Sequence, residues 1–126
     1  TTKNYTQQDI VCLAKNIYFE SRGEPMKGKL AVAMVTLNRA NHETLFDKTI
    51  CKVVYARKQF SWTDTNYKIR DTQAWKEAEA LAHGIVKGYI LVPTINALYF
   101  HTKQVNPHWA KHKTIVAVIG NHIFYS

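Results

Sequence analysis

The chain has 126 residues, of which 46% are hydrophobic and 21% charged, a length and balance that fit one folded domain and exclude a disordered chain. Seventeen Lys and Arg against nine Asp and Glu give a net charge of +8, which favours a polyanionic partner such as nucleic acid or the bacterial envelope. The basic residues are dispersed, so a local nucleic-acid patch is not evident. No apolar run approaches the roughly 18 residues of a membrane-spanning helix, and the polar start is unlike a signal peptide.

Two helices are predicted at the start of the chain. Thr6 can cap the first one, with Asp9 three positions on in a capping-box arrangement. Apolar residues then follow helical spacing until Arg22-Gly23, where Gly and the following Pro25 should end the helix. A second helix is expected from about Pro25 to the region 38–41, with small residues that permit close packing.

A short helix is predicted over 47–55, followed by a polar and aromatic loop or short hairpin over 58–67. The third long helix should cover 71–87, with a cap at Asp71 or Thr72 and a stop at Gly88.

After Pro93 the pattern changes to alternation, which predicts strands over 97–102 and 114–119. Gly120-Asn121 is a two-residue turn leading into a further strand over 123–125. The sequence therefore predicts an α+β fold that is mainly helical, with a short C-terminal β-hairpin and a single domain over 1–126.

The two cysteines leave two interpretations open. Cys12 and Cys51 can form a disulfide in an oxidising compartment, or they can lie separately as small apolar core residues.

Glu20 is the first candidate for chemistry. It ends an apolar helical stretch and follows two aromatic residues, so partial burial should raise its pKa towards the range of a general acid. Glu24 lies four positions on, but Gly23 and Pro25 make one continuous helix unfavourable. The structural alternative pairs Glu20 with Arg22 or Arg39 and leaves Glu24 at the start of the second helix, and spacing alone favours it.

Aromatic and neutral polar residues alternate in two later stretches, a pattern that suits stacking on sugar rings and hydrogen bonding to their hydroxyl groups. The competing interpretation is ordinary core packing. The candidates for substrate contact are Gln59, Phe60, Ser61 and Trp62 in the first stretch, and Tyr99, His101, Asn106 and Trp109 in the second.

A metal site is the weaker alternative. His108 and His112 have the spacing of a helical metal pair, but Trp109 stands where an H-E-x-x-H site needs Glu. No cysteine lies near these histidines and no phosphate-binding Gly-rich loop is present, so we expect a protein that needs neither a metal nor another cofactor.

Six ordered strings, which together span nearly the whole chain, resemble the SleB-type cell wall hydrolases. That family includes spore-cortex lytic enzymes and phage or prophage lysis proteins. The strings lie within residues 12–39, 50–55, 59–62, 97–101, 105–109 and 120–125, and the first contains Ile17-Tyr18-Phe19-Glu20-Ser21-Arg22-Gly23-Glu24-Pro25. This chain has Ser21 where the family frequently has Ala, and Lys58 where variants carry an extra Cys.

The resemblance implies a small lysozyme-like domain that cuts the MurNAc–GlcNAc β-1,4 bonds of peptidoglycan. It also implies a lytic transglycosylase, in which one Glu protonates the leaving oxygen and then accepts a proton from the substrate's 6-hydroxyl group to give a 1,6-anhydro product. Glu20 would have that role, and Ser21 and Glu24 would join the candidates above in contacting the substrate.

We therefore expect a monomeric peptidoglycan-degrading enzyme of the phage endolysin type, acting on the wall without nucleic acid or membrane insertion, and released from the host cytoplasm at lysis. Dispersed basic charge would attach it to the anionic wall. The alternatives are a non-catalytic basic module that binds cell wall or nucleic acid, and a metal-dependent peptidase for the stem peptides.

Overall fold

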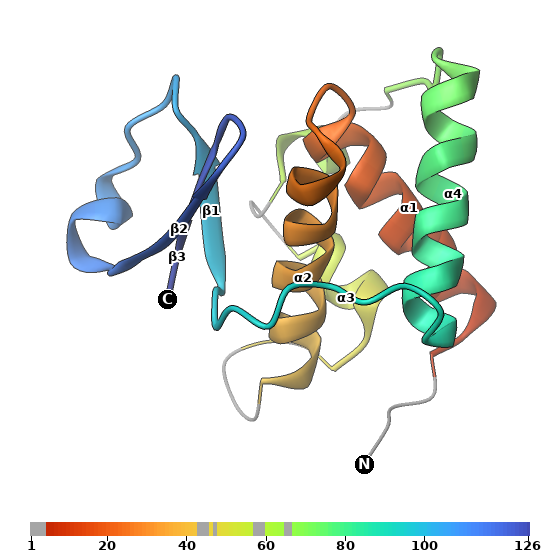
Figure 1. Cartoon of the computed structure of the whole chain (residues 1–126), viewed down its shortest axis with the longest axis horizontal. Coiled ribbons are helices and arrows are strands. Elements are labelled where there is room, and N and C mark those ends of the chain that lie inside the picture. The colour runs from red at the N-terminus through yellow and green to blue at the C-terminus, as the bar shows by residue number, and fades with distance from the viewer. Residues whose placement is uncertain (1–4, 43–45, 47, 57–59, 65–66) are drawn as a thin grey trace.

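The computed structural model describes residues 5–42, 46, 48–56, 60–64 and 67–126. A body of helices lies beside a small antiparallel sheet formed by the C-terminal part of the chain (Figure 1). In chain order the elements are α1 (Gln7–Ser21), α2 (Met26–Asn41), α3 (Ile50–Val54), the 3-10 helix η1 (Ser61–Asp64), α4 (Thr72–Lys87), β1 (Tyr99–Thr102), the 3-10 helix η2 (His108–His112), β2 (Ile115–Ile119) and β3 (His122–Tyr125). The predicted fold class is confirmed.

Helix α1 begins with the predicted capping box. The Thr6 hydroxyl accepts a hydrogen bond from the Asp9 backbone, and the Asp9 carboxylate accepts one from the Thr6 backbone. The helix ends at Ser21, close to the predicted position, but the cause differs from the prediction. Arg22 continues in right-handed helical geometry and Gly23 takes no positive φ, so the α1–α2 turn does not use glycine's conformational freedom.

Helix α4 has the predicted boundaries. The Asp71 side chain accepts a hydrogen bond from the Ala74 backbone over 3.0 Å, which makes Asp71 the cap and not Thr72. At the other end Gly88 has a φ of 85°, a left-handed conformation that glycine adopts without a steric penalty. The segment that precedes α4 lies close to the end of α1 and lines a pocket together with it.

The sheet has the order β1-β3-β2, with β3 antiparallel to both neighbours. The predicted C-terminal hairpin is thus confirmed as β2–β3, with a turn at Gly120-Asn121 in which Gly120 has a φ of 56°. Strand β1 pairs with the other edge of β3, so that Tyr99 lies opposite Tyr125 and Thr102 opposite His122.

The core has two parts, and α2 contributes to both. In the larger part α1 packs against α2, α3 and α4, with Leu13 and Ile17 fully buried. In the smaller part Val32 and Val35 on α2 pack towards Phe124 on β3. Helix α2 therefore joins the helical body to the sheet, and no helix among the described residues is long and apolar enough to cross a membrane.

A disulfide joins Cys12 on α1 to Cys51 on α3, with 5.2 Å between the two Cα atoms. The sequence left open whether the two cysteines are bonded or separate, and the structure shows that they are bonded. The Asp9 carboxylate adds to the same connection by accepting a hydrogen bond from the Cys51 backbone over 3.2 Å.

We predict that reducing this disulfide will lower the free energy of unfolding by roughly 2–4 kcal/mol, because it closes a loop of sequence separation 39 and restricts the unfolded chain. Urea unfolding with and without reductant measures the difference. The Cys12→Ala/Cys51→Ala variant is the control and should not respond to reductant. Equal stability of the oxidised and reduced wild-type protein would contradict the prediction.

Candidate active site

Glu20 lies in the last turn of α1 and opens into a pocket of about 510 Å³. This volume lies within the usual range of ligand-binding pockets. The other lining residues are aromatic or basic: Phe19, Arg22, Trp62, Tyr67, Lys68 and Arg70. Among the described residues that line it, Glu20 is the only acid.

Partial burial raises the pKa of Glu20 from 4.5 to about 7. Loss of water around the carboxyl group penalises its charged form, and this effect outweighs the opposing influences of Trp62 and Arg39. A carboxyl group with this pKa carries its proton in a substantial fraction of molecules at neutral pH. It can therefore donate a proton and afterwards act as a base.

Trp62 on η1 forms one wall of the pocket. Its ring stacks on Phe19 at 4.8 Å between centroids, and its side chain is close enough to the Glu20 carboxyl to lower that group's pKa. The indole N–H is buried and makes no hydrogen bond within ordinary geometric limits in the described part of the chain. A buried donor without a partner costs stability, so this N–H is available to a carboxylate or a ligand in the pocket.

Arg39 near the end of α2 is buried, with an exposed fraction of 5%. Its Nε donates a hydrogen bond to the Leu98 carbonyl oxygen over 2.7 Å, and its guanidinium carbon lies 5.7 Å from the Phe60 ring centroid and 5.6 Å from that of Tyr99. Burial lowers the pKa of Arg39 to about 10, while Tyr99 and Glu20 act in the opposite direction. The guanidinium stays protonated at neutral pH and favours the ionised form of Glu20.

A second aromatic group lies on the sheet. The ring centroids of Tyr99 and Trp109 are 5.7 Å apart, and those of Trp109 and Tyr125 are 5.2 Å apart. The two ring nitrogens of His101 contact the Tyr125 hydroxyl and the Thr102 carbonyl oxygen, each at 2.7 Å. Arg39 connects this group to Glu20 electrostatically, because it interacts with both Tyr99 and Glu20.

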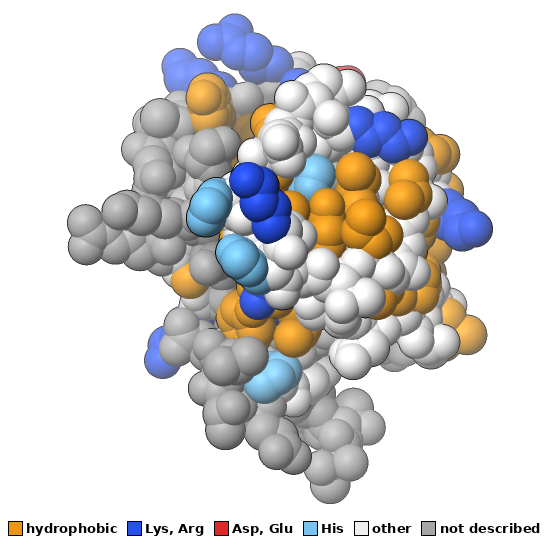
Figure 2. Space-filling model, turned by 90° about the vertical axis from the view of Figure 1, so that its left-hand side faces the viewer, with side chains coloured by type: hydrophobic (Ala, Val, Ile, Leu, Met, Phe, Trp, Pro, Cys, Tyr) orange, Lys and Arg blue, Asp and Glu red, His pale blue; other side chains and the backbone are white. Residues whose placement is uncertain are grey.

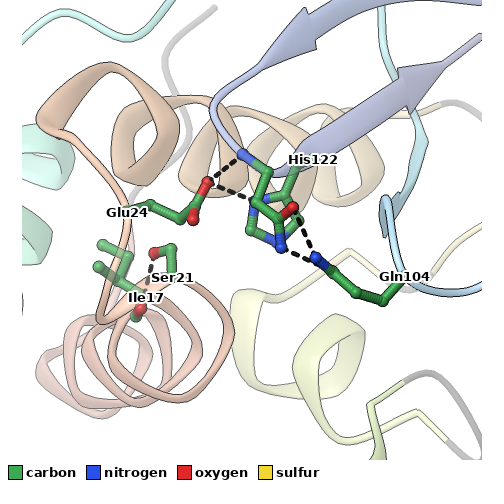
Figure 3. A network of polar contacts seen from close by, with 6 residues as sticks. Ile17, Ser21, Glu24, Gln104 and His122 are labelled. Carbon is green, nitrogen blue, oxygen red and sulfur yellow. Dashed lines mark hydrogen bonds and ion pairs between the residues drawn. The ribbon is translucent and has the colours of Figure 1, made fainter.

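Glu24 connects the α1–α2 turn to the β2–β3 turn (Figure 3). Its Oε1 accepts a hydrogen bond from the Asn121 backbone over 2.7 Å and lies 3.3 Å from Nδ1 of His122. Burial lowers the pKa of His122, against the opposing effect of Glu24, and thus favours the neutral imidazole. A side chain at Gly120 would collide with the Glu24 carboxylate, which shows how closely the two turns approach.

The predicted contact residues thus fall into separate groups. Trp62 shares the pocket with Glu20, whereas Tyr99, His101 and Trp109 form the group on the sheet. Phe60 is buried behind Trp62, and Asn106 is exposed in the loop before η2. Gln59 and the side chain of Ser61 lie outside the described residues.

Ser21 and Glu24 do not line the pocket. The Ser21 hydroxyl is buried and donates to the Ile17 carbonyl oxygen within α1 over 2.7 Å. An internal bond of this kind occupies the hydroxyl, so the interpretation of Ser21 as a substrate contact finds no support here. Glu24 faces the sheet turn, which gives it a connecting role in addition to any contact with a substrate.

Sequence reasoning named Arg39 and Arg22 only as structural partners of Glu20, and it assigned no site role to Lys68 or Arg70. The burial of Arg39 could have been inferred from the sequence, because Val32, Val35 and Arg39 follow helical spacing on one face of α2. A charged residue on an apolar face of this kind is a candidate for a buried charge. Tyr67, Lys68 and Arg70 had no such signal, since they precede α4 in a segment without periodicity.

The described residues contain no group of three or more His, Cys, Asp and Glu side chains that could hold a metal ion. His108 and His112 do lie together, with ring centroids 5.9 Å apart, at the exposed surface of η2. They have no third ligand among the described side chains, and the described lining of the Glu20 pocket offers one carboxylate, which is fewer ligands than a metal ion needs.

Figure 2 shows the side of the molecule at which the sheet lies. Apolar side chains gather on this side. Strand β2 at one edge of the sheet has three exposed apolar residues, Ile115, Val116 and Val118. Lys, Arg and His side chains surround the apolar side chains in Figure 2, while acidic side chains are nearly absent from this view. This face suits contact with an anionic surface.

The chain is similar to cell wall hydrolases. The profile of the family described as Cell Wall Hydrolase matches residues 23–125. The spore cortex-lytic enzyme of Oceanobacillus iheyensis is 35% identical over 125 residues, covering 97% of this chain and 43% of the relative. That of Bacillus subtilis strain 168 is 31% identical over 123 residues, covering 95% and 38%. The chain thus spans less than half the length of these curated relatives.

Solved structures agree with the sequence comparison. The catalytic domain of the germination-specific lytic transglycosylase SleB from Bacillus anthracis is 31% identical, with a TM-score of 0.76 and full coverage of both chains. The catalytic domain of the Bacillus cereus SleB protein is 32% identical, also with a TM-score of 0.76, and the match covers 98% of this chain and 94% of that one. The resemblance inferred from the sequence is confirmed.

We predict that Glu20 makes the stability of the protein depend on pH. Its folded-state pKa of about 7 lies above the unfolded value near 4.5, so the folded protein retains a proton that the unfolded chain has released. The free energy of unfolding should therefore fall as pH rises from about 4.5 to 7 and then level off. Glu20→Gln should match the wild type near pH 4 and exceed its stability at pH 8 by up to about 3 kcal/mol.

Urea unfolding across this pH range measures the effect. Glu79→Gln, an exposed change on α4, is the matched control and should keep the wild-type pH dependence. Identical pH profiles for the wild type and Glu20→Gln would show that the Glu20 carboxyl is not buried as described.

We predict that Glu24 acts mainly through the turn contact. Glu24→Ala should lower the free energy of unfolding by about 1–3 kcal/mol, because it leaves the Asn121 N–H without its acceptor. The Asn121 amide should also exchange its hydrogen faster. Glu24→Gln keeps an acceptor oxygen and should retain most of the stability and activity. A Glu24→Gln variant with unchanged stability and exchange but no activity would assign the residue to the chemistry instead.

Proposed function

The chain belongs to the cell wall hydrolase family, and from this premise we propose that it is a peptidoglycan lytic transglycosylase with Glu20 as its single catalytic acid and base. The supporting observation is the state of Glu20. It is partly buried, its pKa is about 7, and it is the only acid among the described residues that line the pocket.

The number of carboxylates separates this reaction from ordinary glycoside hydrolysis. Retaining and inverting glycosidases use two carboxyl groups on either side of the scissile bond. Here Glu24, the acid nearest in sequence, is occupied by the Asn121 backbone and His122. A mechanism that needs one carboxyl group therefore fits the described pocket better than one that needs two.

In the proposed reaction, protonated Glu20 gives its proton to the glycosidic oxygen of the MurNAc–GlcNAc β-1,4 bond as the bond to C1 of MurNAc breaks. The Glu20 carboxylate then accepts the proton of the MurNAc 6-hydroxyl group, whose oxygen forms the new bond to C1. The product ends in a 1,6-anhydro ring, and Glu20 regains its starting proton. No water is consumed and no cofactor takes part.

Trp62 and Arg39 support the ionised stage of this cycle. The free indole N–H of Trp62 can donate to the carboxylate that forms after proton transfer, and the buried guanidinium of Arg39 favours the same charge. Burial of the Glu20 carboxyl group has the opposite effect on its pKa, so the group still carries a proton before the reaction begins. The aromatic group of Tyr99, His101 and Trp109 provides ring faces for sugars farther along the strand.

The biological setting is a finer part of the proposal. The sequence favours a monomeric, phage-type lysis enzyme held on the wall by its basic surface, whereas the curated relatives are named spore cortex-lytic enzymes. Parallel assays on vegetative sacculi and on spore cortex separate these settings. Preference for vegetative wall supports the lysis role, and activity on cortex alone contradicts it. The partly buried Glu20 argues against a purely wall-binding module, for which a carboxyl group in a pocket serves no purpose.

We predict that Glu20→Gln will reduce release of sugar-chain products from purified sacculi by about a hundredfold to ten-thousandfold while wall binding and folding persist, because it removes the titratable proton. Mass spectrometry should find wild-type products that are one water lighter than hydrolysed ones. Glu79→Gln is the control and should remain fully active. Cut stem peptides would instead indicate a peptidase, and hydrolysed sugar ends a muramidase.

A further inference from the structure

We propose that Arg22, Lys68 and Arg70 form a carboxylate-binding rim of the Glu20 pocket, which holds the acidic stem peptide of the MurNAc residue being cleaved. The inference rests on the proposed function and adds to it a preference for glycan strands whose stem peptides carry free carboxylates. It concerns substrate selection and leaves the role of Glu20 unchanged.

The three cations come from two segments but line one pocket. Arg22 follows the last residue of α1, and Lys68 and Arg70 lie in the segment before α4. All three side chains are exposed, and among the described residues none of them forms an ion pair. Their charge is therefore available to a ligand in the pocket.

The buried hydroxyl of Tyr18 holds the two segments together. It accepts hydrogen bonds from Arg22 Nη1 over 2.6 Å and from the backbone N–H groups of Arg70 and Asp71 over 3.2 and 3.0 Å. The Arg22 guanidinium also lies 4.8 Å from the centre of the Tyr18 ring. An arginine fixed in this way loses less conformational entropy when it binds an anion than a free side chain would.

The proposed chemistry of Glu20 gives these cations no task. The transferred proton passes between Glu20 and sugar oxygens, and the sugar rings themselves are uncharged. The stem peptide, by contrast, is attached through the lactyl group on O3 of MurNAc, within one sugar ring of the scissile bond. A carboxylate-bearing chain therefore leaves the substrate close to Glu20, and Arg is well suited to bind carboxylates through paired donors.

Wall polymers could supply anionic groups as phosphates, so the test removes them. Soluble, uncross-linked peptidoglycan strands with intact stem peptides are first freed of wall polymers with hydrofluoric acid. Half of the sample is then amidated with carbodiimide and ammonium, which neutralises the peptide carboxylates and leaves the glycan intact. The rates of cleavage of both substrates give kcat and KM for each protein variant.

The main variant is Lys68→Gln/Arg70→Gln, which leaves the contact between Arg22 and Tyr18 in place. The triple variant with Arg22→Gln extends it. The matched control for the triple variant is Lys52→Gln/Lys76→Gln/Lys87→Gln, which removes the same charge from exposed positions that do not line the pocket.

We expect the wild type to cleave native strands with a roughly threefold to tenfold higher kcat/KM than amidated strands, mainly through KM, as solvent-exposed charge contacts allow. The double variant should reduce this preference, and the triple variant should lose it and match the wild type on amidated strands; an undiminished preference in the triple variant would overturn the proposed rim. The control should keep the preference. Equal wild-type rates on both substrates, or an equal loss of preference in the control, would overturn the rim. Failure of the wild type to cleave either substrate would instead overturn the proposed function, and the rim with it.

Discussion

Partial burial of the Glu20 carboxyl is the constraint on which the site depends. Removing water from a carboxyl group raises its pKa, and a fully buried one would hold its proton too firmly to return as a base. The observed balance near pKa 7 has three contributors: burial on one side, and Trp62 and Arg39 on the other. Arg39 is itself buried at a cost, as its lowered pKa shows, so the two groups lessen each other's desolvation penalty.

The last turn of α1 and the residues after it bring the parts of the site together. Within seven positions, Tyr18 binds the segment before α4, Glu20 faces Trp62 on η1, and Glu24 binds the β2–β3 turn. Segments far apart in the sequence thus meet around one helix end. The disulfide and the packing of α2 fix that helix in the body, so the pocket rests on the rigid part of the fold.

The sequence predicted the elements well because their signals are local. Thr6 with Asp9, and Gly88 in left-handed geometry, mark helix ends through contacts within a few residues. The end of α1 shows the limit of such reasoning, since Gly23 correctly suggested a break but does not adopt the conformation that would cause one. The partial burial of Glu20 was predictable for the same local reason, as it ends an apolar and aromatic helix.

The remaining site residues depend on contacts that no local pattern encodes. The sequence placed Glu24 at the start of the second helix. It could not show the hydrogen bond to the Asn121 backbone, because Asn121 lies 97 residues away. Ser21 belongs to a motif beside the candidate acid, yet its hydroxyl turns back to Ile17. The rim cations were indistinguishable from other surface charges until Tyr18 was seen to bring their segments together.

The basic residues of the site also show why a net charge alone says little about mechanism. Arg39 is buried, so its charge acts on Glu20 with little screening and affects the pKa of that carboxyl group. Arg22, Lys68 and Arg70 line the same pocket but face water and salt, which screen their effect on the carboxyl group. Basic side chains can therefore surround a carboxyl group without removing its proton, provided that the ones facing the pocket are exposed to solvent.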